Sequence, residues 1–196
     1  MSEIIFATHN EGKLREIRRI FEGSGYTVTG MRDAGFSEEI EETGTTFSEN
    51  AAIKARAVWE KTGGLVMADD SGIEIDFFDG GPGVYSSRFL GEDTPYTEKN
   101  AIILDRMKGV PEEKRGARYV AVIHAVLPDG RELETEGRVE GIIAQQPAGE
   151  GGFGYDPVFF VPELGKGFAE ASMEEKNRIS HRGKALEAMK AALGAL

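Results

Sequence analysis

Residues 4–13 read IIFATHNEGK, and they set the expectation for the rest of the chain. The apolar run at residues 4–7 is typical of a buried strand, and the amphipathic stretch from Leu14 is typical of a helix. The hexapeptide between them is therefore predicted to be a tight loop entering a helix N-terminus; it comprises Thr8, His9, Asn10, Glu11, Gly12 and Lys13. Such an N-terminus favours anions, and Lys13 adds a charge suited to phosphate. An ordinary surface turn would show the same pattern.

Composition narrows the class of protein. The chain has 196 residues, no cysteine and a formal net charge of −11. This length is enough for one continuous domain with its own core, so we expect a single domain over residues 1–196 with no linker. The lack of cysteine fits a reducing compartment, and the acidic balance argues against nucleic-acid binding. The sequence shows neither a signal segment nor a membrane span, so a cytoplasmic protein is expected.

Hydrophobic periodicity predicts an alternation of strands and helices, typical of an α/β fold. The predicted elements are a helix from Leu14 to Gly23, a strand at 26–30, a helix at 47–61 capped by Thr46 or Ser48, strands at 65–68 and 73–76, a helix from Thr94 to Met107, a hairpin around 128–130, a strand at 158–161 and a last helix from Ser180. On the helix at 47–61, Asn50 and Lys54 are four residues apart and so share a face.

The acidic residues at 69–72 (DDSG) follow the short apolar run at 65–68. We expect that strand to end there, because Asp, Ser and Gly form turns readily. Carboxylates are costly to bury unless they are paired or bind a metal, and open α/β sheets place ligands at the carboxyl ends of their strands. The residues at 69–72 are therefore either a plain turn or part of a site.

Two further stretches combine polar groups with glycine or a helix start. Residues 149–154 (GEGGFG) match the dinucleotide-binding pattern, but they run into an apolar strand rather than a helix, so we reject that interpretation. Phe153 and Tyr155 are instead predicted to meet a planar ligand. Lys176 follows a capping box, and His181 and Arg182 open the last helix, where cations oppose the helix dipole. An anionic or carbonyl-bearing ligand would remove that conflict.

Together, the segments at 8–13, 41–44, 69–72, 153–156 and 180–182 resemble those of the inosine/xanthosine triphosphate pyrophosphatases, which remove non-standard purine nucleotides. The pieces FGYD and SHR are the most specific, whereas His9 replaces a glycine often found there. The resemblance implies an elongated two-lobed α/β/α fold with a central mixed twisted sheet and a cleft between the lobes. It also implies a homodimer and Mg²⁺-dependent hydrolysis of a nucleoside triphosphate to the monophosphate and pyrophosphate.

The resemblance also assigns residues. Asp70 would be the base, and Glu41 and Asp70 would hold Mg²⁺, while the roles of Asp69 and Glu42 stay open. Phe153 would stack on the purine, and His181 with Arg182 would donate to its 6-oxo group, which adenine lacks. The substrate-binding set is Thr8, His9, Asn10, Glu11, Gly12, Lys13, Lys54, Ser71, Phe153, Gly154, Tyr155, Asp156, Lys176, His181 and Arg182.

Three other interpretations compete with this one. The chain could be a related pyrophosphatase acting on modified pyrimidine or other nucleotides. It could be a non-catalytic module that binds purine nucleotides, although binding alone gains little from acidic residues beside phosphates. It could also be an acidic interaction protein, which leaves the cluster of Lys13, Lys54, Lys176 and Arg182 unexplained.

Overall fold

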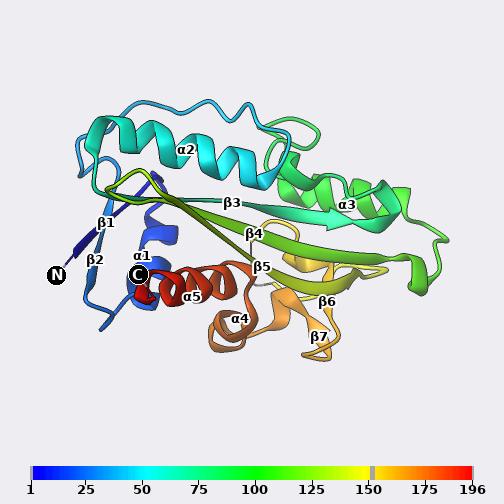
Figure 1. The fold of residues 1–196 in the computed structure, drawn as a ribbon. Coiled ribbons are helices and arrows are strands. Elements are labelled where there is room, and N and C mark those ends of the chain that lie inside the picture. Colours follow the sequence, from blue (N-terminus) through cyan, green and yellow to red (C-terminus); the bar gives the residue numbers. More distant parts are fainter. Residues whose placement is uncertain (1, 151–152, 196) are drawn as a thin grey trace. The chain divides into compact units, whose positions relative to one another are not determined.

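The computed structural model of the protein describes residues 2–150 and 153–195. In this part of the chain, seven strands form one sheet in the order β2-β1-β3-β4-β5-β6-β7 (Figure 1). The strands are β1 (Ser2–Phe6), β2 (Tyr26–Gly30), β3 (Leu65–Ile75), β4 (Gly116–Val126), β5 (Glu132–Ile143), β6 (Phe159–Val161) and β7 (Lys166–Gly167). The α-helices are α1 (Glu11–Ile20), α2 (Phe47–Thr62), α3 (Tyr96–Arg106), α4 (Met173–Ile179) and α5 (His181–Gly194).

The sheet is mixed. Strand β1 pairs in parallel with β2 and with β3, whereas β6 pairs antiparallel with β5 and with β7. The predicted α/β class with a mixed sheet is therefore confirmed. Several predicted elements are found within a few residues of their expected bounds, including β2, α2 with Thr46 as its cap, and the strand after the glycine loop. Gly151 and Gly152 of that loop lie outside the described residues.

Chain contacts divide the protein into two compact units. The first comprises Met1–Asp70, Ala121–Gly137 and Arg182–Leu196, and the second comprises Ser71–Val120 and Arg138–His181. The expectation of a single domain with two lobes and no linker stays a prediction.

The first unit buries apolar side chains on both faces of its strands. Because side chains alternate along a strand, Ile4 and Phe6 join a cluster with residues of α1 and α5, and Ile5 joins another with residues of α2. Figure 1 shows the corresponding layers, with α2 on one side of β1 and β3 and with α1 and α5 on the other. This two-sided burial is typical of parallel strands.

The second unit has its own core. Residues of β3, α3, β4, β5 and the segment around β6 form one apolar cluster, which includes Ile73, Ile75, Ile103, Met107, Val139, Phe159 and Phe168. Among the side chains of this unit that the structure describes, four large aromatic or aliphatic ones are exposed, namely Phe77, Tyr85, Leu90 and Phe153. Only Phe153 belongs to the predicted site.

The predicted break at residues 69–72 is wrong. Strand β3 continues from Leu65 to Ile75, so the two short strands expected there are one. Asp69 and Asp70 are both buried within it. Their turn-forming tendency is overridden because each carboxylate finds partners on neighbouring elements, as described below.

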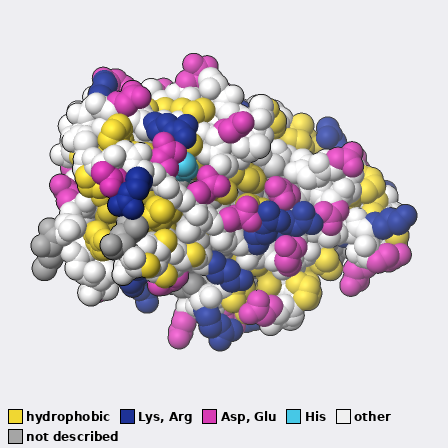
Figure 2. Space-filling view, in the orientation of Figure 1, with side chains coloured by type: hydrophobic (Ala, Val, Ile, Leu, Met, Phe, Trp, Pro, Cys, Tyr) yellow, Lys and Arg dark blue, Asp and Glu magenta, His cyan; other side chains and the backbone are white. Residues whose placement is uncertain are grey.

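The surface carries mixed charge. Figure 2 shows acidic and basic side chains interspersed over the face that it draws. Among the described residues, no helix combines the length and the apolar character needed to cross a membrane.

Candidate active site

The loop after β1 begins helix α1 as its sequence predicts. The side chain of Asn10 caps the helix by accepting a hydrogen bond from the backbone N–H of Lys13 at 3.0 Å. The hydroxyl oxygen of Thr8 in turn accepts from the backbone N–H of Asn10 at 3.2 Å. Lys13 therefore lies in the first turn of α1. His9, Glu11 and Gly12, which complete the hexapeptide, are exposed.

Asp69 and Asp70 point to opposite sides of β3. Odd-numbered residues before them, such as Met67, pack with the α1 and α5 cluster, and even-numbered residues, such as Ala68, pack with the α2 cluster. Because the alternation continues along the strand, Asp69 faces α1 and α5 and Asp70 faces α2. Two adjacent carboxylates thereby enter two different environments.

Asp69 is an internal ion-pair partner. Its side chain is 2% exposed, and its oxygens accept bonds from Nζ of Lys13 at 3.0 and 2.9 Å and from Nε of Arg182 at 3.1 Å. Burial alone would raise the pKa of Asp69, but the charges of Lys13, Arg182 and Lys54 outweigh burial and hold this pKa well below its ordinary value. Asp69 is therefore ionised and holds both cations in place.

Glu16 is a second partner of Arg182 that sequence reasoning missed. Nη1 of Arg182 donates to its carboxylate at 2.9 Å. Burial would lower the pKa of Arg182, but Asp69 and Glu16 raise it. The conflict between a cation and a helix N-terminus, which suggested an anionic ligand, is thus already relieved by two carboxylates of the protein. The sequence could have indicated this residue, because Glu16 lies one turn after Lys13 and therefore shares a face of α1 with it.

Asp70 is held by a buried amide. Asn50 is fully buried; its Nδ2 donates to Oδ2 of Asp70 at 3.1 Å, and its Oδ1 accepts from the backbone N–H of Gly44 at 2.8 Å. A Cβ at position 44 would lie 2.6 Å from that Oδ1 atom, so this bond requires glycine. The amide of Asn50 therefore joins the glutamate-rich loop at residues 38–44, here called the acidic loop, to the middle of β3.

Lys54 extends this arrangement from the same face of α2. Its Nζ donates to Glu42 at 2.6 Å and lies 3.9 Å from Oδ1 of Asp70. Glu41, the predicted metal ligand, is exposed, whereas Glu42 is partly buried. The two glutamates therefore differ in their surroundings, because Glu42 is partly buried against Lys54 and Glu41 is exposed. The metal-binding role of Glu41 stays a prediction.

A pocket of about 280 Å³ in the first unit is lined by some of the groups described above. Its lining includes two lysines, Lys13 and Lys54, and the carboxylates of Asp69, Glu39 and Glu42. Thr8 and His9 of the hexapeptide line it as well. The structure thus places part of the hexapeptide and both lysines around one hollow, whereas Asp70 and Glu41 are not among the residues that line it. Phosphate binding there stays a prediction.

A second group of predicted residues lies in the second unit, around the carboxylate of Asp156. This carboxylate accepts from the backbone N–H of Phe153 at 3.0 Å and from Nζ of Lys176 at 2.9 Å. Phe153 is 78% exposed, and its ring lies 5.3 Å from that of Tyr96. The carbonyl of Gly154 accepts from Asn100 at 3.0 Å. Phe153 therefore has an anchored backbone and an accessible ring.

Tyr155 differs from its neighbour Phe153. Its side chain is only 3% exposed and its hydroxyl donates to the backbone carbonyl of Ser86 at 2.6 Å. Burial raises the pKa of this hydroxyl above its ordinary value. The ring of Tyr155 is therefore part of the core rather than a surface for a planar ligand. Ser71, which follows Asp70 on β3, is partly buried, and its binding role stays a prediction.

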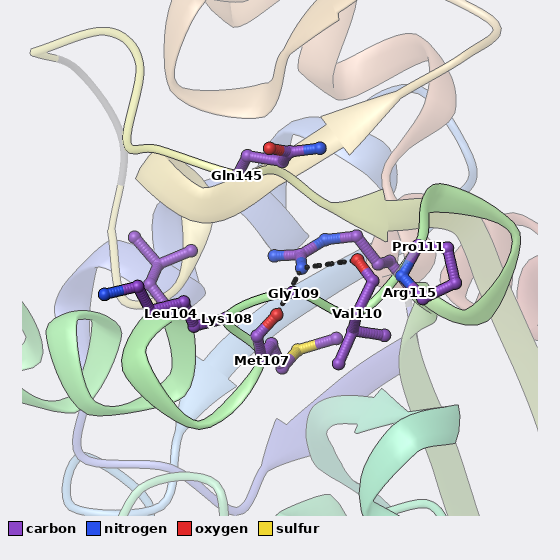
Figure 3. Close-up of a pocket in the computed structure, with 8 residues that line it drawn as sticks. All are labelled: Leu104, Met107, Lys108, Gly109, Val110, Pro111, Arg115 and Gln145. Atoms are coloured by element: carbon purple, nitrogen blue, oxygen red, sulfur yellow. Dashed lines mark hydrogen bonds between the residues drawn. The ribbon is translucent and has the colours of Figure 1, made fainter.

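A larger hollow of about 440 Å³ in the second unit is unrelated to the predicted residues (Figure 3). Arg115 lies in its wall, but its guanidinium is occupied by backbone carbonyls. It donates to Met107 at 2.8 Å, to Ile143 at 2.6 Å and to Ala144 at 2.7 Å. This arginine ties two backbone segments together, one at Met107 and one at residues 143–144, so its charge is not directed at a ligand.

Known proteins resemble this chain over nearly its whole length. A family model described as "Ham1 family" matches residues 4–192. A dITP/XTP pyrophosphatase of Thermoanaerobacter sp. (strain X514) is 50% identical over 188 residues, which cover 96% of this chain and 94% of that protein. The dITP/XTP pyrophosphatase of Bacillus subtilis (strain 168) is 47% identical over 187 residues, covering 95% of this chain and 94% of that protein.

Solved structures agree in fold as well. A Ham1 protein from Coxiella burnetii superposes with a TM-score of 0.93 at 37% identity and covers 100% of both chains. The resemblance that the sequence motifs indicated is thereby confirmed. The family model, the sequence identity and the fold together show that the chain belongs to the Ham1 family.

Proposed function

We propose that the protein hydrolyses non-standard purine nucleoside triphosphates (ITP, dITP and XTP) to the monophosphate and pyrophosphate, and so clears them from the nucleotide pool. The observation that carries the proposal is the separation of Asp69 from Asp70 on β3. Asp69 positions Lys13 and Arg182, which suits a polyanionic substrate. Asp70 is held by the neutral amide of Asn50 and lies beside Lys54. The relatives at about half identity are named as dITP/XTP pyrophosphatases.

The reaction assigns a role to each group of the first unit. Water attacks the α-phosphorus, a bond forms between them, and the bond to the bridging oxygen of the β-phosphate breaks. Pyrophosphate leaves with that electron pair, and the carboxylate of Asp70 takes the proton of the water. Lys13 and Lys54 hold the phosphate oxygens, on which negative charge gathers as the bond breaks.

The donor set fits Mg²⁺. Within residues 2–150 and 153–195, no group of three or more His, Asp or Glu side chains is placed to hold a metal on its own. Mg²⁺ is commonly bound by one or two carboxylates and by substrate phosphates, so Asp70 with Glu41 would suffice. When bound, the ion would make a coordinated water more acidic and neutralise phosphate charge.

The residues proposed for the base end of the nucleotide are Phe153, Lys176, His181 and Arg182. Phe153 offers an exposed ring for stacking. Lys176 donates to the carboxylate of Asp156, which also accepts from the backbone N–H of Phe153. His181 and Arg182 donate to the 6-oxo group. Arg182 has several N–H donors, of which its bonds to Asp69 and Glu16 use two. Adenine presents a donor at that position, which leaves donor facing donor.

Replacing Arg182 by alanine should narrow the preference for ITP over ATP. An unpaired buried polar group costs about 1–3 kcal/mol, so the ratio of kcat/KM values should fall by about 10- to 100-fold. Steady-state kinetics with both nucleotides measures this ratio. Alanine at Arg15, which is exposed on α1, is the matched control. An unchanged ratio in the Arg182 variant would place base selection elsewhere.

The deciding experiment for the function is a panel of ITP, XTP, GTP, ATP, dTTP and UTP with Mg²⁺, with pyrophosphate as the readout. We expect pyrophosphate from ITP and XTP, little from ATP and GTP, and none when the metal is chelated. Preference for dTTP or UTP would indicate a pyrimidine enzyme. Orthophosphate instead of pyrophosphate would mean attack at the terminal phosphorus, and binding of ITP without release would indicate a binding module.

We also propose that the enzyme works in the cytoplasm as a homodimer. The family resemblance supports the dimer, and the absence of cysteine in the sequence is compatible with a reducing compartment. Sedimentation of the purified protein tests the dimer.

A further inference from the structure

Tyr119 is a buried residue outside the predicted site that contacts two members of it. It lies on β4 in the second unit and is 8% exposed. Its hydroxyl donates to Oδ1 of Asp156 at 2.9 Å. Its ring stacks on the imidazole of His181, with centroids 5.1 Å apart and an interplanar angle of 13°. A single side chain therefore connects the anchor of Phe153 with a proposed reader of the base.

The hydroxyl of Tyr119 completes the environment of Asp156. The other carboxylate oxygen, Oδ2, accepts from Lys176 and from the backbone N–H of Phe153. Burial and the nearby charge of Asp156 raise the pKa of Tyr119 well above its ordinary value, so the hydroxyl stays protonated and donates. Both oxygens of Asp156 are thus engaged, and the carboxylate has a defined orientation.

The ring of Tyr119 is itself held in place. Phe159 packs against it with centroids 4.7 Å apart, and Phe168 lies at 5.9 Å. Both phenylalanines are buried. Interiors packed in this way do not let a ring turn freely. The face that Tyr119 presents to His181 is therefore a fixed one.

We propose that Tyr119 is a positioning residue for base recognition, whose ring sets the plane of the His181 imidazole. This inference rests on the proposed function and deepens it. A hydrogen bond weakens steeply when its angle falls below about 120°, so a tilted imidazole donates poorly to a 6-oxo group. Fixing the plane of His181 strengthens the contact with a 6-oxo purine, and adenine gains nothing from it.

Two substitutions at this position separate the ring from the hydroxyl. Tyr119→Leu removes the stacking face, and we expect the ITP-over-ATP ratio of kcat/KM to fall about tenfold. Tyr119→Phe keeps the face, and we expect it to retain that ratio within about twofold while KM for ITP rises a few-fold through the loosened Asp156. Tyr26→Phe, on β2 in the first unit, removes a hydroxyl outside both groups and should change neither quantity.

A readout that does not depend on turnover tests the positioning directly. The chain has three histidines, so the imidazole C–H signals can be assigned by proton NMR. Loss of the stacked ring in Tyr119→Leu should shift the His181 signal, whereas Tyr119→Phe should leave it nearly in place. An unmoved His181 signal, or an unchanged ITP-over-ATP ratio in a folded Tyr119→Leu protein, would overturn the proposal. If the unmodified protein released no pyrophosphate, the proposed function would fail, and the NMR shift alone would still decide whether Tyr119 fixes His181.

Discussion

Replacing Asp70 by asparagine is expected to lower kcat for ITP by about 10²- to 10⁴-fold while nucleotide binding stays measurable. The amide cannot take the proton of the attacking water, but it has nearly the same shape as the carboxylate. Its oxygen can still accept the bond from Asn50, so the strand and the acidic loop should stay in place. Pyrophosphate release gives the loss of turnover, and calorimetric titration with ITP gives the binding constant.

Asparagine at Asp33 is the matched control, since that aspartate belongs to the first unit and is exposed. It should turn over ITP at the rate of the unmodified protein. A near-normal kcat in the Asp70 variant would refute the assigned base. A parallel loss of binding and folding would mean instead that Asp70 matters chiefly for the structure of the loop.

Local signals predicted the entry to the site well. An apolar run, a tight polar loop and a lysine in the first turn are all short-range features, and β1 and the start of α1 follow from them. The cap itself, Asn10, was not predicted. Short-range features did predict Thr46 before α2 and the capping box of Ser172 with Glu175 before α4. Capping depends on residues within one turn of each other, so the sequence displays it directly.

Long-range pairing is what the sequence concealed. Asp69 lies 56 positions from Lys13 and 113 positions from Arg182 along the chain, so nothing local shows that its charge is compensated. Without those partners, the turn tendency of residues 69–72 decides the prediction, and β3 is broken in two. Tyr119 was missed for the same reason, because its contacts with Asp156 and His181 come from distant segments.

The different environments of Asp69 and Asp70 also depend on that strand. Adjacent residues take opposite faces only in an extended strand, whereas in a turn the two carboxylates could serve either role. Once β3 is continuous, the alternation from Leu65 onward assigns Asp69 to the side of α1 and α5 and Asp70 to the side of α2. The predicted break in β3 and the inability to tell Asp69 from Asp70 by sequence therefore have the same cause, namely that the long-range partners of Asp69 are not visible in the sequence.

Asparagine at Asp69 is expected to lower the free energy of unfolding at neutral pH by about 3–5 kcal/mol, because it leaves the charges of Lys13 and Arg182 without their shared partner. Urea unfolding at pH 7 measures this loss. The control is Asp129→Asn. Asp129 pairs with Arg131 at the exposed turn between β4 and β5, so this substitution should scarcely change the free energy of unfolding. A similarly small effect at Asp69 would show that the buried pairs contribute little to folding.

The pH dependence gives a second test with a definite sign. The pKa of Asp69 in the folded protein lies below its ordinary value of 3.8, so the unfolded chain takes up the proton first as the pH falls. The stability contributed by the ionised carboxylate is therefore fully present well above pH 3.8 and declines as the pH falls from there through the folded-state pKa. The Asp69→Asn protein has no such proton to take up at this position. The difference in unfolding free energy between the two proteins should thus be constant between pH 5 and 7 and should shrink below about pH 4. A gap that stays constant into acid would show that Asp69 is not the ionised partner of Lys13 and Arg182, because only loss of that charge makes the stabilities converge.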